Sequence, residues 1–173
     1  KIINFISRIF KFEFLKKIFE NPKYASWKTY SFEPDPDNYK KLSNFVKQSK
    51  LGNSVIVKKG LWDKTTQMNF FGLGTPESGI SNEQNFSSWS GDIKNSKNQV
   101  NIYKLSVVNI DEYFKNINPP SYIKMDIEGA ELEALRGSRK IITKYHPKLA
   151  ICIYHKPSDL WKVPLLILSI DPT

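Results

Sequence analysis

The sequence predicts a doubly wound α/β fold with a mostly parallel sheet, on the strength of two observations. Short apolar runs alternate with segments of helical periodicity along most of the chain, which is the pattern of successive βαβ units. The run at 148–155, KLAICIYH, is almost entirely apolar, as expected for a strand buried on both faces of a parallel sheet. Because 173 residues suit one hydrophobic core, we expect a single domain over 1–173.

Local chemistry predicts the individual elements. KTYSF at 28–32 is rich in aromatic and β-branched residues, which favours a strand, and Pro34 ends it. A helix is expected at 36–48, where Pro36 suits the first turn. The other expected strands are 54–58, 66–74, 100–108 at the sheet edge, 121–126 and 148–155, and the other expected helices are 109–117, 129–143 with a split at Gly137-Ser138, and 156–170 in two pieces around Pro164.

Two segments stand apart from this alternation. The stretch 1–20 is apolar and aromatic but interrupted by charges, so we expect one or two amphipathic helices packed on the protein. A helix lying on a membrane surface is the alternative. The polar stretch 75–98 is expected to be a loop excursion. No apolar run approaches the roughly 20 residues of a membrane span, and no signal-peptide pattern is recognised.

The amino-acid composition limits which binding partners and which cellular compartment we expect. The net charge is +9, but only three of the 26 basic residues are Arg, the residue best suited to phosphate and base-edge contacts. We therefore interpret the charge as a solvated Lys-rich surface and expect no nucleic-acid partner. The single cysteine, Cys152, excludes an internal disulfide and is interpreted as a small core residue of a cytoplasmic protein.

Polar residues or glycine follow four of the expected strands. They are Glu33, Gly60, Asp126 with Glu128, and His155. Because the carboxyl ends of parallel strands meet at one edge of the sheet, and ligands of such sheets bind there, we expect these residues to border one site.

Two of these stretches suit a nucleoside-containing cofactor. A carboxylate at the tip of a strand, such as Glu33, can accept hydrogen bonds from two ribose hydroxyls. Gly60 would let the backbone approach the ligand, while Leu61 or Trp62 would cover a flat ring. The alternative for this second stretch is an ordinary turn between strands with a packed Trp.

The other two stretches suit proton transfer. Asp126 ends a strand, so its carboxylate is expected to face the site, border the cofactor and take a proton from a hydroxyl. Glu128 and His155 are the further candidates, although a lone His is more often structural. Glu131 is interpreted as a charge that complements the helix dipole. An Mg²⁺ ion between Asp126 and Glu128 is allowed but not required, so no metal site is assigned.

Several of these segments together resemble one family. YSFEPDPDNYKKL, KKGLWDK, NIDEYF, YIKMDIEGAELEALRGSRKII and HPKLAICIYHKPSDLW are similar to the FkbM family of S-adenosylmethionine-dependent methyltransferases. MDIEGAELEALRG is the most specific stretch and FEPDP the next. The resemblance implies a class I, Rossmann-like methyltransferase sheet and O-methylation, often of sugars, glycolipids or natural products. It places Glu33 at the cofactor ribose, and Asp126 and Glu128 on the active-site side with His155 nearby.

One family feature is missing from the sequence. The family's glycine-rich turn follows the first strand, whereas the first glycine here is Gly52 and no strand is recognised before 28–32. The chain also stops at Thr173, before the strands that would complete the sheet. Either a segment between Arg8 and Phe14 is omitted, which we expect, or the cofactor site has been lost.

The sequence therefore predicts an S-adenosylmethionine-dependent O-methyltransferase acting on a hydroxyl of a small molecule or glycan, with its oligomeric state open. A noncatalytic binding module that uses 75–98 as its contact surface is the alternative from another class. A nucleotide-sugar or dinucleotide enzyme would also place Glu33 on a ribose, but it needs a phosphate cradle that the sequence lacks.

Overall fold

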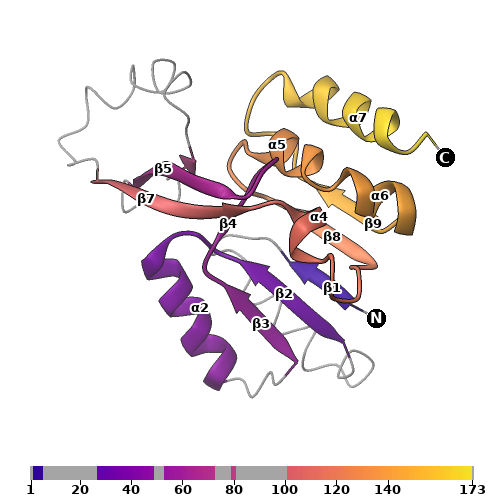
Figure 1. Ribbon diagram of the computed structural model, residues 1–173. Coiled ribbons are helices and arrows are strands. Elements are labelled where there is room, and N and C mark those ends of the chain that lie inside the picture. The colour runs from indigo at the N-terminus through magenta and orange to yellow at the C-terminus, as the bar shows by residue number, and fades with distance from the viewer. Residues whose placement is uncertain (1, 6–26, 49–52, 73–78, 81–100, 173) are drawn as a thin grey trace.

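Five parallel strands form the main sheet of the protein (Figure 1). The computed structural model describes residues 2–5, 27–48, 53–72, 79–80 and 101–172. Along the sheet the strands lie in the order β3-β2-β1-β8-β9, and every neighbouring pair is parallel. Their bounds are β1 Ile2–Phe5, β2 Lys28–Phe32, β3 Ser54–Val57, β8 Tyr122–Met125 and β9 Lys148–Ile151. The chain moves outward from β1 to β3 and then returns to the other side of β1, so the strand order reverses at β1.

Both faces of this sheet carry helices, which confirms the doubly wound fold. On β3, Val55 and Val57 belong to the main core, whereas Ile56 packs with Leu42 of α2 (Pro36–Gln48) on the opposite face. This alternation follows from the two-residue period of a strand. The main core also receives α4 Ile110–Tyr113, α5 Glu131–Arg136, α6 Arg139–Tyr145 and α7 Asp159–Ile170.

A second, mixed sheet accounts for the strands expected at 66–74 and 100–108. Its order is β4-β7-β5-β6, with β5 antiparallel to both β7 and β6. The bounds are β4 Gly60–Leu61, β5 Thr66–Gly72, β6 Gly79–Ile80 and β7 Asn101–Val108. The prediction that 100–108 lies at the edge of the main sheet is therefore wrong, because β7 lies between β4 and β5 of this sheet. Within the expected loop 75–98, Gly79–Ile80 is a short strand, and the other residues lie outside the described ones.

The beginning of the chain differs from the sequence prediction. Ile2–Phe5 form the central strand β1, where we expected helix and recognised no strand. A short apolar run with β-branched residues is compatible with either structure, and only its pairing with β2 and β8 decides. Residues 6–20 of the expected helical segment, and the expected omission between Arg8 and Phe14, lie outside the described residues.

The carboxyl-terminal elements are closer to the prediction. The expected split at Gly137-Ser138 is confirmed, since it separates α5 from α6. The expected division of the last helix is wrong, because α7 is continuous with Pro164 inside it. Strand β9 ends at Ile151 and is half-buried rather than buried on both faces, since it is the last strand in the order of the described sheet. Within the described ranges, no helix is long and apolar enough to cross a membrane.

Candidate functional site

Two of the predicted site residues flank the point where the strand order reverses. Glu33 directly follows β2, and Asp126 directly follows β8. Strand β1 lies between β2 and β8 and is parallel to both. Glu33 and Asp126 therefore lie at the same carboxyl edge of the sheet, one on each side of the end of β1. Ligands of doubly wound sheets bind at this position.

The chain fixes Glu33 through local hydrogen bonds. Its backbone N–H donates to Val57 O (3.0 Å), which extends the pairing of β2 with β3. Its Oε1 accepts the N–H of Asp35 (2.9 Å), and the residue is 3% exposed. The Asp35 carboxylate in turn accepts the backbone N–H groups of Asp37 and Asn38 and so caps α2. Asp35 and Asp37 thus lie at the start of the helix, where acidic side chains are favourable.

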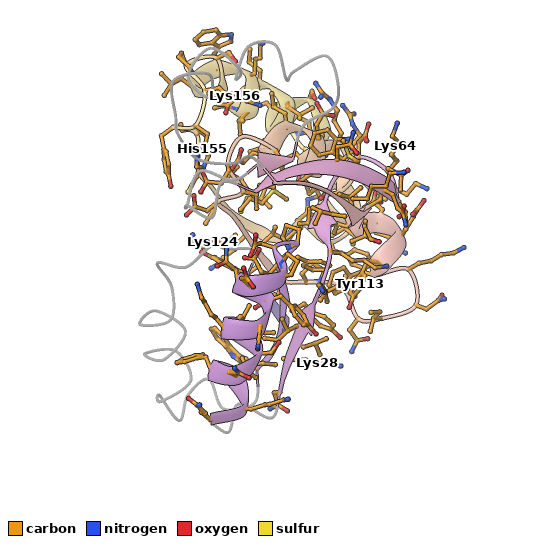
Figure 2. The ribbon with its side chains drawn as sticks, turned by 90° about the vertical axis from the view of Figure 1, so that its left-hand side faces the viewer. Lys28, Lys64, Tyr113, Lys124, His155 and Lys156 are labelled. Carbon is orange, nitrogen blue, oxygen red and sulfur yellow. The ribbon has the colours of Figure 1, made fainter. Side chains whose placement is uncertain are left out.

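Asp126 lies in a cluster of side chains from the ends of β8 and β9. The Tyr154 hydroxyl donates to Asp126 Oδ1 (2.6 Å), and His155 Nε2 lies 3.2 Å from the same oxygen. Lys124 Nζ lies 3.6 Å from Asp126 Oδ2. Figure 2 shows Lys124, His155 and Lys156 along one side of the molecule, away from Tyr113. The structure therefore brings Asp126 and His155 together, as the positions of these residues after two strands predicted.

His155 faces carboxylates on both edges of its ring. Its Nδ1 lies 3.5 Å from Glu128 Oε2, and its Nε2 lies 3.4 Å from Glu131 Oε1 in addition to the contact with Asp126. The side chain is 10% exposed. These contacts hold the imidazole at the carboxyl edge of the sheet, and a buried, carboxylate-bound His suits proton transfer.

The turn between β8 and α5 brings its acids to His155 through two left-handed residues. Glu128 has φ 58° and Gly129 has φ 88°, and a non-glycine residue in this region marks a constrained turn. A Cβ at Gly129 would lie 2.8 Å from Lys156 Cε, while Lys156 Nζ donates to Gly129 O. The positive φ favours glycine at position 129, whereas the flexible Lys156 side chain could move away from an added Cβ.

Glu131 is a residue beside His155 that sequence reasoning left out of the site. We interpreted it as a charge that complements the helix dipole, but it is 0% exposed and its Oε1 accepts the Ile127 N–H (2.8 Å). Burial raises the pKa of the Glu131 carboxyl, backbone hydrogen bonds and the charge of His155 oppose this rise, and the charge of Asp159 adds to it. Helical spacing from Glu128 gave no signal, because Glu128 has a left-handed backbone in the turn before α5.

Further residues at the Asp126 cluster were also missed or interpreted differently. Tyr154 was not considered; its hydrogen bond to Asp126 raises its pKa well above the ordinary value, so the hydroxyl stays a donor. Cys152 was expected in the core, but it is half-buried. Its burial, and to a smaller extent the charge of Asp126, raise the pKa of its thiol.

Among the described residues, no group of three or more His, Cys, Asp or Glu side chains could hold a metal ion.

The expected ring-covering stretch, Gly60 to Trp62, is buried. Gly60 and Leu61 pair with β7, and Leu61 is 2% exposed within the main core. Trp62 is 8% exposed and packs with Val107. Packing accounts for these residues, as the alternative interpretation held, and their contact with a cofactor stays a prediction.

The comparisons with known proteins agree with this geometry. The family model described as the Methyltransferase FkbM domain matches residues 12–167. The chain belongs to the FkbM methyltransferase family. No curated protein matches the sequence.

A solved member of this family has a similar fold. The crystal structure of Methyltransferase FkbM from Methylobacillus flagellatus KT has a TM-score of 0.67 and 26% sequence identity, and the match covers 99% of this chain. It covers 37% of that chain, so this FkbM domain spans a little over one third of the length of its structural relative. The family and the relative confirm a methyltransferase scaffold.

Proposed function

We propose that this FkbM domain is an S-adenosylmethionine-dependent O-methyltransferase that acts on a hydroxyl, with a carbohydrate as the preferred class of acceptor. The observation that carries the proposal is the placement of Glu33 and of the Asp126–His155 pair on either side of the β1 end. One position suits a ribose, and the other suits a group that takes up a proton.

Glu33 supports the cofactor part of the proposal. A carboxylate has capacity for about four hydrogen bonds, so one carboxylate can accept both the Asp35 N–H and ribose hydroxyls. When bound, S-adenosylmethionine supplies a methyl group already activated on a sulfonium. The protein then has to orient the acceptor oxygen and exclude water from the site.

Asp126 and His155 support the proton-transfer part. A hydroxyl loses its proton as its oxygen becomes methylated, and a positioned base speeds such a step. The distance of 3.2 Å between His155 Nε2 and Asp126 Oδ1 suits a carboxylate–imidazole pair that accepts this proton together. Glu128, at 3.5 Å from Nδ1, would stabilise the imidazolium that forms.

Tyr154 supports the choice of a carbohydrate acceptor. Its hydroxyl is held by Asp126, yet the residue is 69% exposed. An aromatic side chain that combines an open apolar face with a polar tip suits a ligand that is itself apolar on one face and polar at its edges, such as a sugar ring.

The single cysteine of the sequence agrees with a cytoplasmic location for this protein.

The link between β1 and β2 supports the alternative function. Residues 6–27 contain no glycine, so the methionine end of the cofactor has no glycine-rich turn to approach. A noncatalytic module on the methyltransferase scaffold would follow if the cofactor does not bind.

Calorimetric titration with S-adenosylmethionine separates the two functions. We expect saturable binding, followed by transfer of a radiolabelled methyl group to an acceptor from a panel of sugars and glycolipids. A protein that is folded by circular dichroism and takes up no S-adenosylmethionine or S-adenosylhomocysteine would instead be the noncatalytic module.

We predict that Glu33→Gln weakens binding of S-adenosylmethionine roughly tenfold, because the amide keeps one acceptor oxygen and loses about one charge-assisted hydrogen bond to the ribose. Calorimetry on both proteins measures the change. Asp37→Asn is the matched control, since Asp37 is an exposed acid of the same segment, and it should bind like the wild type. Equal affinity of Glu33→Gln and the wild type would remove Glu33 from the cofactor site.

A further inference from the structure

Glu131 holds two structural elements at once. From the first turn of α5, its Oε1 accepts the backbone N–H of Ile127 at 2.8 Å. The same oxygen lies 3.4 Å from Nε2 of His155. One buried oxygen thus connects the turn that carries Asp126 with the segment that carries His155.

The second oxygen of Glu131 lies in an acidic and apolar interior. Within the part of the chain that the structure describes, Glu131 Oε2 and both carboxylate oxygens of Asp159 are buried without a hydrogen-bond partner. Asp159, in the first turn of α7, is 1% exposed and close enough for its charge to raise the pKa of Glu131. A buried carboxylate without donors is costly, and neutralisation of the group removes most of that cost.

Protonation of Glu131 at Oε2 is compatible with its buried position and with both contacts of Oε1. A protonated carboxyl keeps its other oxygen as an acceptor, so Oε1 still accepts the Ile127 N–H and stays 3.4 Å from His155 Nε2. The contact with His155 therefore does not require Glu131 to be charged. Asp126 supplies the ionised partner of the imidazole at 3.2 Å.

We propose that Glu131 is a positioning residue for His155: through Oε1 it holds the ring, together with Asp126, in the tautomer that carries hydrogen on Nε2. This role rests on the methyltransferase function proposed above. The lone pair of the neutral ring is then on Nδ1, the nitrogen that faces the partly exposed Glu128. During transfer the acceptor oxygen bonds to the methyl carbon as the carbon–sulfur bond breaks, and the hydroxyl proton passes to Nδ1.

The charged and titratable groups around His155 come from five segments. They are Lys124 of β8, Asp126 and Glu128 of the following turn, Glu131 of α5, Cys152, Tyr154 and Lys156 of the segment after β9, and Asp159 of α7. Among them, Glu131 is the one that combines full burial with a direct approach to Nε2.

Imidazole nitrogen NMR tests the proposal without cofactor or acceptor. The sequence has two His residues, and His146, which lies 2.6 Å from Asp171 on the far end of α6, gives an internal reference once a His146→Gln variant assigns its signals. At a pH where the ring is neutral, we expect wild-type His155 to show the Nε2–H tautomer. A wild-type ring with its hydrogen on Nδ1 would overturn the proposal before any position-131 variant is made.

Two substitutions then separate positioning from packing. Glu131→Gln keeps an oxygen at Oε1 and places an NH₂ group at the buried Oε2 position, so the tautomer and the rate should stay close to wild type. Methionine at position 131 has a similar length to glutamate but no acceptor oxygen, so His155 in Glu131→Met should populate both tautomers. We expect kcat to fall by up to about 100-fold and its pH profile to change. The KM for S-adenosylmethionine should change little. Glu133→Met, on the partly exposed side of the same helix, is the control and should behave as wild type.

The outcomes distinguish this role from the proposed function. An unchanged tautomer and pH profile in Glu131→Met would overturn the positioning role, and so would equal damage in Glu131→Gln and Glu131→Met, because the acceptor oxygen would then not be the decisive feature. A Glu131→Met variant with the mixed tautomers, in a protein that binds no S-adenosylmethionine, would support the positioning role and refute the methyltransferase proposal.

Discussion

Replacing Asp126 by Asn is expected to lower kcat for methyl transfer by about 100- to 10,000-fold, the usual contribution of a positioned acid–base group. The amide cannot hold a negative charge beside His155 Nε2, which lies 3.2 Å from Asp126 Oδ1. It also loses the charged partner of the Tyr154 hydroxyl and of Lys124. The shape of the side chain is nearly unchanged, so the loss should appear in turnover rather than in folding.

A radiolabelled-methyl assay measures this loss, and calorimetry measures whether the cofactor still binds. We expect the affinity for S-adenosylmethionine to change much less than kcat, because Glu33, the residue proposed to bind the ribose, lies across the end of β1 from Asp126. Asp37→Asn, an exposed acid in α2, should turn over normally. If Asp126→Asn also turns over normally, Asp126 is not part of the proton-accepting pair.

Sequence reasoning could predict the parts of the fold that local chemistry determines. The strand at Lys28–Phe32 and the helix at Pro36–Gln48 have the expected bounds, because β-branched residues, a proline and one apolar helical face act within a few residues of each other. The break at Gly137 was visible for the same reason. What local chemistry leaves undetermined is which strands pair.

Pairing between distant segments explains most of the errors in the fold. Strand β1 became recognisable only through its neighbours β2 and β8. Strand β7 was predicted at a sheet edge from its alternating sequence, but it pairs with both β4 and β5. In the site, the ends of parallel strands could be predicted to converge, so Asp126 and His155 were found. Glu131 was missed because its burial depends on α7 and on the chain after β9, which the sequence does not place beside α5.

Gly137 carries the largest expected effect on stability. Replacement of a glycine near a helix end by alanine ordinarily favours the helix by up to about 1 kcal/mol. Here a Cβ at position 137 would lie 2.3 Å from Trp62 O and 3.2 Å from Asp63 Cα. Both are backbone atoms, and Trp62 is itself anchored, because its N–H donates to Val108 O (3.1 Å) and its side chain is buried. The clash cannot be relieved by rotating a side chain.

We therefore predict that Gly137→Ala lowers the free energy of unfolding by about 2 to 3 kcal/mol, the upper range of ordinary overpacking. The carbonyl of Gly137 also accepts the Asp111 N–H (2.9 Å), and the Asp111 carboxylate accepts N–H groups at the start of α6. A shift of the backbone at Gly137 would therefore disturb the contact between α4 and α6 as well. Urea denaturation measures the loss. Lys140→Ala, at an exposed position of α6, introduces an alanine without a clash and should stay within about 0.5 kcal/mol of the wild type. A Gly137→Ala protein as stable as wild type would mean that α5 does not approach the Trp62 backbone as closely as this structure places it.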